Sequence, residues 1–171
     1  DLVASRSAIE QLLGDHGYAF ANVNTITDIG EDAQRVDFVF AVDPGPLIYV
    51  RKINISGNQA TRDEVIRREV RQLESSVFSA EKIRRSRERI RRLGFFDDVN
   101  IETTSVPGAV DQVDLAISVK ERATGNFMFG AGYADSDGLF LVAEVHRANL
   151  FGTGRELNFE FEVSKIDQVF D

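Results

Sequence analysis

An internal repeat is the feature that most constrains what this 171-residue chain can fold into. Three short strings recur in the same order, and each second copy lies 76 or 77 residues after the first. Gly17-Tyr18 recurs as Gly94-Phe95, Val23-Asn24 as Val99-Asn100, and Arg35-Val36-Asp37-Phe38 as Gln112-Val113-Asp114-Leu115. A single match of this length would be chance, but three at a nearly constant offset indicate one structural unit present twice.

Each copy of the unit is predicted to run strand, helix, helix, strand, strand. In the second copy, strand patterns cover residues 47–56, 98–104 and 112–121. The first copy shows only a helix over residues 7–17 and strands over 21–27 and 35–42, joined by a hairpin loop at 30–34. We therefore expect the chain to begin inside a module, with the DPGP sequence at 43–46 as the boundary between the two copies.

Two helices are predicted between the first and second strands of the complete unit. Thr61 and Glu64 have the spacing of a capping box, in which the hydroxyl and the carboxylate cover the first free amides of a helix. The buried stripe of this helix would be Val65, Ile66, Val70 and Leu73. The second helix is predicted to begin near Ser79, to bury Ile83, Ile90 and Leu93, and to end at Gly94.

After Gly125 the pattern changes, because strands follow one another with no helical spacing between them. Phe127, Phe129, Ala131 and Tyr133 fall on one face of a strand, and Met128, Gly130 and Gly132 on the other. The same period of two recurs in two later segments. The first segment alternates Leu139, Leu141, Ala143 and Val145 with Phe140, Val142, Glu144 and His146. The second alternates Leu157, Phe159, Phe161 and Val163 with Glu156, Asn158, Glu160 and Glu162. A transmembrane barrel strand gives this alternation, and so does a soluble sheet with one buried face.

Composition and charge exclude several classes of protein. No run approaches the roughly 20 apolar residues of a membrane-spanning helix, and without cysteine there are no disulfides or thiolate metal sites. The net charge of −8 is unevenly divided, since residues 61–93 carry a net of +5 and the rest of the chain −13. A basic nucleic-acid face is one interpretation. A solvated helix pair is favoured, because the acidic remainder would repel phosphate backbones.

No catalytic, cofactor or metal site is predicted. His16 and His146 are the only histidines and have no second metal ligand at a helical or strand spacing. The acidic pair Asp97-Asp98 has no candidate nucleophile nearby. The glycines of residues 125–132 and 152–154 lie in a strand and a turn, whereas a phosphate-binding loop would place them before a helix. The chain is therefore predicted not to be an enzyme.

The repeat unit resembles the POTRA module, a periplasmic βααββ unit. The segment GFFDDVNIETTSVPGAVDQVDLAISVKERATGNFMFGAGY, residues 94–133, is similar to the end of the last POTRA module and the first barrel strand of the BamA family. NLFGTG, at 149–154, resembles the turn between that family's second and third barrel strands.

The resemblance implies a fold of α+β POTRA modules followed by antiparallel strands of a truncated transmembrane β-barrel. Residues 1–46 would be the C-terminal half of a POTRA module, the fourth in the family, and residues 47–122 the complete fifth. Residues 123–171 would be only the first strands of the barrel. They would form three or four strands, whereas the smallest membrane barrels need about eight.

The resemblance also implies an outer-membrane assembly factor that folds and inserts β-barrel precursors at a lateral gate, without ATP. It would lie in the cell outer membrane with its POTRA modules in the periplasm. The implied partners are the outer-membrane lipoproteins of the assembly complex, unfolded β-barrel precursors and outer-membrane lipid, and not nucleic acid. A related autotransporter-assembly factor or two-partner secretion pore remains an alternative, as does a soluble periplasmic scaffold of POTRA-like modules.

Three sets of residues are expected to carry this function. The gate strand that meets the substrate would be Asn126, Phe127, Met128, Phe129, Gly130, Ala131, Gly132 and Tyr133, with Gly130 and Gly132 weakening the packing of the seam. The lipoprotein dock would be Arg67, Arg68, Arg71 and Glu74, and the lipid-facing residues Leu157, Phe159, Phe161 and Val163. The edge strand at 98–104 has no proline and is expected to accept an extended peptide.

Overall fold

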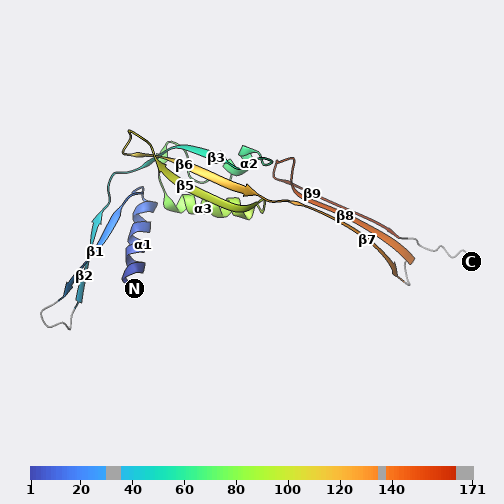
Figure 1. The fold of residues 1–171 in the computed structure, drawn as a ribbon, viewed down its shortest axis with the longest axis horizontal. Coiled ribbons are helices and arrows are strands. Elements are labelled where there is room, and N and C mark those ends of the chain that lie inside the picture. The colour runs from blue at the N-terminus through green and yellow to red at the C-terminus, as the bar shows by residue number, and fades with distance from the viewer. Residues whose placement is uncertain (30–35, 135–137, 165–171) are drawn as a thin grey trace, which may run out of the picture.

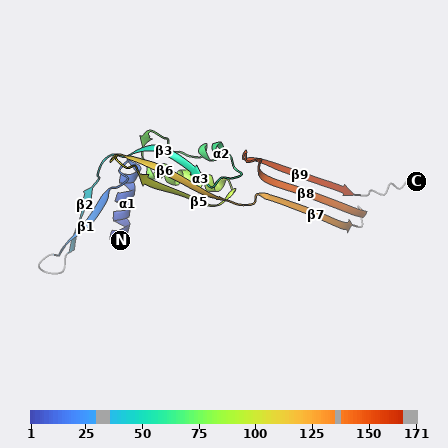
Figure 2. The ribbon, with the colours of Figure 1, turned by 45° about the horizontal axis from the view of Figure 1, so that its top comes forward.

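The computed structural model describes residues 1–29, 36–134 and 138–164. Over these residues the elements are α1 (Leu2–Asp15), β1 (Asn22–Ile29), β2 (Val36–Asp43), β3 (Tyr49–Ser56), α2 (Asp63–Arg67), β4 (Ser76–Val77), α3 (Ala80–Arg92), β5 (Phe96–Ser105), β6 (Gln112–Glu121), β7 (Gly125–Ala134), β8 (Gly138–Leu150) and β9 (Arg155–Ser164). They form three parts in a row (Figures 1 and 2): α1 with β1 and β2, the elements from β3 to β6, and β7 to β9. We call these parts the first module, the second module and the C-terminal sheet.

The second module is a four-stranded mixed sheet packed against helices. Its strand order is β4-β3-β6-β5, with β3 parallel to β6 and β5 antiparallel to it. The inward residues of β6 alternate with exposed or half-buried ones, as the sequence pattern predicts. The core combines these residues with the inward residues of β3 and β5, the apolar faces of the helices and a few adjacent loop residues. Its members are Ile48, Val50, Ile53, Val65, Ile66, Phe78, Ile83, Ile90, Phe95, Phe96, Val99, Ile101, Val113, Leu115, Ile117 and Val119.

The long helix of this module begins and ends as predicted. The Ser79 hydroxyl accepts a hydrogen bond from the Lys82 backbone N–H at 3.3 Å, which caps the N-terminus of α3. Gly94 follows the C-terminus with a φ of +74°, a conformation that glycine adopts without steric strain. Ile83 and Ile90 are buried, and Leu93 packs against the core from its margin.

The first helix of the module is shorter than predicted, and the predicted capping box is wrong. Arg62, not Thr61, is the N-cap residue of α2, and no side chain caps this end. The helix ends at Arg67, since the chain must turn back to pair β4 with β3. Leu73 therefore lies beyond the helix and is 66% exposed, whereas it was expected in the buried stripe.

The first module contains a helix and a two-stranded antiparallel sheet. α1 begins at Leu2, five residues earlier than expected, and Gly17 follows it with a φ of +102°. β1 and β2 pair along their whole length, as a hairpin requires, while the predicted loop at 30–34 lies outside the described residues. The Gly17 carbonyl accepts a hydrogen bond from Ile48 N at 2.9 Å, and this bond connects the first module to the second.

The C-terminal sheet consists of three long antiparallel strands in the order β7-β8-β9. It leads away from the second module and is open at both margins in the part of the chain that the structure describes (Figure 1). The α+β modules and the antiparallel strands after them are thus as predicted, and these three strands form no closed barrel. None of the helices in the described residues is long and apolar enough to cross a membrane.

Candidate functional site

The C-terminal sheet has one apolar face and one largely polar face that continue across all three strands. Cross-strand pairing aligns Phe127 with Val145 and Phe159, Phe129 with Ala143 and Phe161, and Ala131 with Leu141 and Val163. The opposite face carries Asn126, His146 and Asn158, then Met128, Glu144 and Glu160, then Gly130, Val142 and Glu162. A register shift of one residue would mix the two faces, so the pairing preserves the alternation seen in the sequence.

The apolar face is uncovered in the structure. Phe127 is 73% exposed and Tyr133 is 74% exposed, and Leu157, Phe159, Phe161 and Val163 are all exposed as well. Contiguous apolar surface of this kind is uncommon on a protein surface that meets water. The predicted lipid-facing residues therefore lie together on one exposed surface.

The two gate-strand glycines differ in their surroundings. A Cβ placed on Gly132 would lie 2.3 Å from Cζ of Phe140, the residue directly opposite on β8. A Cβ on Gly130 would meet nothing within 4 Å. The expectation of weak packing at both glycines is therefore wrong for Gly132, because the Phe140 ring occupies the space above it, as aromatic rings do over glycines in other sheets.

β7 forms one margin of the C-terminal sheet. All eight residues predicted for the gate, from Asn126 to Tyr133, lie within this strand. Among the described strands β7 pairs only with β8, so its outer row of backbone N–H and C=O groups has no strand partner. Such an edge can accept a further strand through main-chain hydrogen bonds.

The turn between β8 and β9 lies directly against the second module. The Gly152 carbonyl accepts a hydrogen bond from Arg62 N at 3.0 Å, and Asn149 Nδ2 donates to Thr61 Oγ1 at 2.7 Å. Thr61 is only 2% exposed and Asn149 9%. The Thr61 hydroxyl predicted to cap α2 is therefore used in this contact, and Asn149 was not predicted to have a role.

A carboxylate at the end of β6 supports the same segment. Glu121 accepts hydrogen bonds from the backbone N–H groups of Ala60 and Thr61, at 2.9 and 2.6 Å. Burial by itself would raise the pKa of Glu121, but the hydrogen bonds from the Thr61 side chain and from nearby backbone groups outweigh it and lower the pKa. The ionised carboxylate is thus the form that stabilises residues 60 and 61.

The predicted dock residues do not form a single cluster. Arg67 and Glu74 lie together, with 3.8 Å between Arg67 Nη1 and Glu74 Oε1, and Arg67 Nη2 donates to the Ile53 carbonyl at 3.1 Å. Arg68 instead lies 3.7 Å from the Glu69 carboxylate. Arg71 lines a separate groove of about 470 Å³ along α3, with Lys82, Arg85, Glu88, Arg89 and Arg92.

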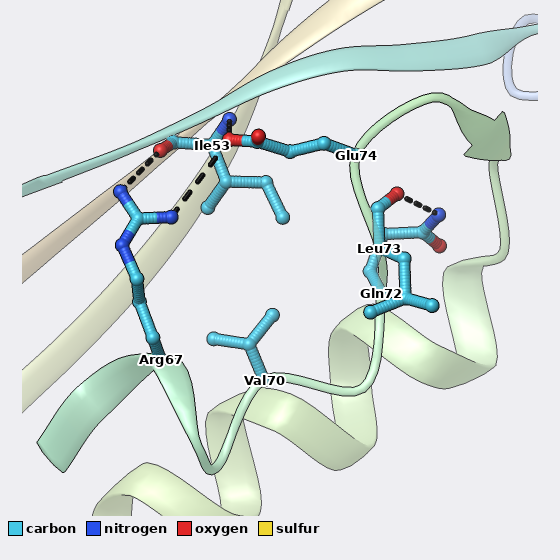
Figure 3. A pocket seen from close by; sticks show the side chains of 6 residues that line it. All are labelled: Ile53, Arg67, Val70, Gln72, Leu73 and Glu74. Atoms are coloured by element: carbon cyan, nitrogen blue, oxygen red, sulfur yellow. Dashed lines mark hydrogen bonds and ion pairs between the residues drawn. The ribbon is translucent and has the colours of Figure 1, made fainter. Parts of the chain in front are cut away.

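Arg67 and Glu74 flank a pocket of about 410 Å³ that also has apolar walls (Figure 3). Ile53, Val70 and the exposed Leu73 line it. The buried Gln72 side chain holds the loop behind it by donating to the Leu73 carbonyl at 3.2 Å and accepting from Ser79 N at 3.0 Å. The structure therefore adds an apolar centre to the charged surface predicted from sequence, and places Leu73 beside Glu74.

The predicted peptide-binding strand is at the edge of its sheet, but two of its carbonyls are already contacted by arginine side chains. β5 pairs only with β6 among the described strands. Arg87 Nη2 donates to the Ile101 carbonyl at 3.2 Å, and Arg91 Nη2 lies 3.5 Å from the Val99 carbonyl. An incoming strand would have to displace both guanidinium groups from this edge.

Within residues 1–29, 36–134 and 138–164, no three acidic or histidine side chains are grouped in a way that could hold a metal ion. His146 contacts the Asn158 amide oxygen and lies 3.5 Å from the Glu156 carboxylate, all on β8 and β9. His16 is the C-cap residue of α1, in the first module.

The fold and the site define a class of protein: POTRA-type modules joined to an antiparallel sheet with one exposed apolar face. The model of the POTRA family, described as "Surface antigen variable number repeat", matches residues 1–45 and 48–122. The chain therefore belongs to the POTRA family.

The relatives narrow this to a BamA-like chain. It is 40% identical to the outer membrane protein assembly factor BamA of Neisseria meningitidis serogroup B, over 96% of this chain and 21% of the relative. It is 34% identical to BamA of Nitratidesulfovibrio vulgaris, over 82% of this chain and 18% of the relative. The crystal structure of BamA from Haemophilus ducreyi lacking POTRA domains 1–3 has a TM-score of 0.83 at 36% identity, covering 95% of this chain and 31% of that one.

These matches bear on several of the sequence predictions. The predicted resemblance to BamA is confirmed, and the relatives are named assembly factors, so the prediction that the chain is not an enzyme is confirmed as well. The predicted location, the outer membrane with the POTRA modules in the periplasm, is also confirmed. The chain spans about a fifth of the length of the curated relatives that it matches.

Proposed function

We propose that this chain is part of an outer-membrane assembly factor that inserts β-barrel precursors by pairing them with the free edge of β7. The observation that carries the proposal is the position of β7 at the margin of the described sheet, whose one face is continuously apolar. The apolar face is suited to lipid, and the edge offers main-chain donors and acceptors to an incoming strand. Strand pairing of this kind uses no nucleotide, cofactor or metal.

The three parts would then have separate locations. Residues 1–46 and 47–122 would be the fourth and fifth POTRA modules in the periplasm, and residues 123–171 the first strands of a membrane barrel. The likeness to a BamA structure that lacks POTRA domains 1–3 supports this numbering. The uncovered aromatic face disfavours a soluble scaffold, because such a face would promote aggregation in water.

The pocket between Arg67 and Glu74 is our candidate dock for an outer-membrane lipoprotein of the assembly complex. Its exposed Leu73 and the charged groups beside it form an apolar centre with a polar rim, the usual anatomy of a protein interface. Arg68 and Arg71 would contribute only at the margins, since Arg68 lies against Glu69 and Arg71 lines the separate groove along α3.

A reversible crosslink tests the gate in the membrane-embedded protein that carries this chain. A cysteine at Met128 paired with a cysteine on the last barrel strand should close the seam and stop insertion of precursor barrels, and reduction should restore insertion. The control uses the same β7 cysteine paired with one at Glu144, which lies directly opposite it on β8. That crosslink joins strands that are already paired and should leave insertion unchanged. Insertion at the normal rate through a verified, fully crosslinked seam would refute the gate.

A further inference from the structure

Residues 60–62 of the second module are held from two sides. On one side Glu121, at the end of β6, accepts the N–H groups of Ala60 and Thr61. On the other side the Gly152 carbonyl, in the β8–β9 turn, accepts the N–H of Arg62. Three successive backbone donors are thus satisfied by groups from two different parts of the protein, which makes this segment a joint between them.

The Thr61 and Asn149 side chains connect the two sides of the joint. Thr61 donates its backbone N–H to the Glu121 carboxylate at 2.6 Å, and its hydroxyl accepts a hydrogen bond from Asn149 Nδ2 at 2.7 Å. Asn149 Oδ1 in turn accepts from Gly154 N at 2.8 Å, so the same side chain also fixes the shape of its own turn. Asn149 has a φ of +60°, a left-handed conformation that asparagine tolerates better than most residues.

The turn fits the module without space to spare. A Cβ on Gly152 would lie 1.9 Å from the Ala60 carbonyl oxygen. A Cβ on Gly154 would lie 2.5 Å from Arg68 Nη2 and 3.2 Å from Val65 Cγ1. Gly152 is required by its close approach to the Ala60 backbone as well as by its φ of +70°. Gly154 is required by its φ of +72°, since the Arg68 guanidinium could move aside.

A second attachment lies next to this one. Arg122, in the linker between β6 and β7, donates from Nε to the Gly94 carbonyl at 2.7 Å. The Thr124 carbonyl accepts a hydrogen bond from Ala148 N at 2.9 Å, which connects the linker to β8. A linker alone would allow rotation about one point, whereas the linker together with the contacts of the β8–β9 turn restricts the orientation.

We propose that the Asn149–Thr61–Glu121 hydrogen-bond chain is a latch that sets the orientation of the second module relative to the C-terminal sheet, and that Asn149 and Thr61 are positioning residues for strand insertion. The link to insertion rests on the proposed function, whereas the orientation itself does not. When the latch is closed, the module and β8–β9 move together. When it is open, the Arg62–Gly152 backbone hydrogen bond and the linker at 122–124 are the remaining connections among the described residues.

The test measures orientation directly in the membrane-embedded protein. Spin labels on cysteines at Arg84 of α3 and Asn158 of β9, both exposed positions, report the distance between module and sheet. Thr61→Val removes the hydroxyl at nearly constant volume, and Thr61→Ser restores it. Asn149→Gly removes the amide and keeps the left-handed backbone. The matched control is Thr153→Val, since that hydroxyl bonds only the Leu150 carbonyl inside the turn.

We expect one narrow distance in the unmodified protein, in Thr61→Ser and in Thr153→Val, and a broadened or shifted distribution in Thr61→Val and Asn149→Gly. Gly152→Ala should broaden it too, by forcing the turn away from Ala60. Heat-modifiable gel mobility selects samples in which the barrel is folded. A narrow, unshifted distance in Thr61→Val and Asn149→Gly would overturn the latch.

The insertion rate separates the latch from the proposed function. We expect Thr61→Val to slow insertion of precursor barrels several-fold and Thr61→Ser to restore it. A broadened distance with a normal insertion rate would overturn the role of Thr61 and Asn149 in insertion. If the unmodified protein inserts nothing, the proposed function fails, while the distance measurement still decides the latch.

Discussion

Alanine substitution at Gly132 should destabilise the C-terminal sheet relative to the same substitution at Gly130. The new Cβ at position 132 would lie 2.3, 2.7 and 3.1 Å from three carbons of the Phe140 ring, so the ring must turn away. Overpacking of this kind costs about 1–3 kcal/mol. We expect a value near 1 kcal/mol, because Phe140 is half-buried and can rotate. The gain of about 0.4–1 kcal/mol from a less flexible unfolded chain applies to both glycines and cancels in the comparison.

The free energy of unfolding in urea, measured on the lipid-embedded protein, gives the comparison. Gly130→Ala should equal or exceed the parent in stability, since nothing lies within 4 Å of its Cβ. In a Phe140→Ala background the difference between the two alanine variants should disappear, since the ring that clashes has been removed. Equal stability of Gly132→Ala and Gly130→Ala, or a difference that persists without the Phe140 ring, would show that the ring over Gly132 is not the cause.

Three further predictions follow from the same structure. Phe159→Arg, at mid-bilayer depth on the apolar face, should lower the free energy of unfolding by about 2–4 kcal/mol, and Asn158→Arg on the polar face should be tolerated; equal effects would place the wrong face in lipid. Glu74→Lys combined with Arg67→Glu should weaken lipoprotein pull-down, most at low salt, while the exposed Glu64→Lys should not; unchanged yield would exclude this pocket as the dock. Arg87→Ala with Arg91→Ala should tighten binding of an extended barrel-precursor peptide at β5, seen as amide shifts confined to residues 96–105; shifts elsewhere would contradict this.

Patterns that are local in sequence predicted most of the fold. Ser79 and Gly94 delimit α3 because a capping hydroxyl and a left-handed glycine act within one helical turn. The alternation in β6 and in β7 to β9 fixes which residues share a face, and the pairing of the strands agrees with it. These signals depend on neighbours a few residues away, and so a single sequence contains them.

The errors occurred where distant residues decide the local structure. The hydroxyl of Thr61 was assigned to a helix cap, but its partner Asn149 is 88 residues further along the chain. Leu73 keeps the helical spacing of Val65 and Ile66, yet the helix ends earlier so that β4 can reach β3. The two glycines of NLFGTG, at 149–154, were the sign of the junction that the sequence offered, since glycine allows close backbone approach.

The parallel pairing of β3 with β6 has a consequence for the order of folding. Arg51 on β3 and Asp114 on β6 form an ion pair although they are 63 residues apart in sequence. A chain that emerges from a translocation pore with its N-terminus first would expose β3 long before β6 arrives. The loop between them must then close against its conformational entropy, which makes this pairing a late and slow step. Until then the edge of β3 that faces β6 has no partner strand, and it is open to pairing with other chains during that interval.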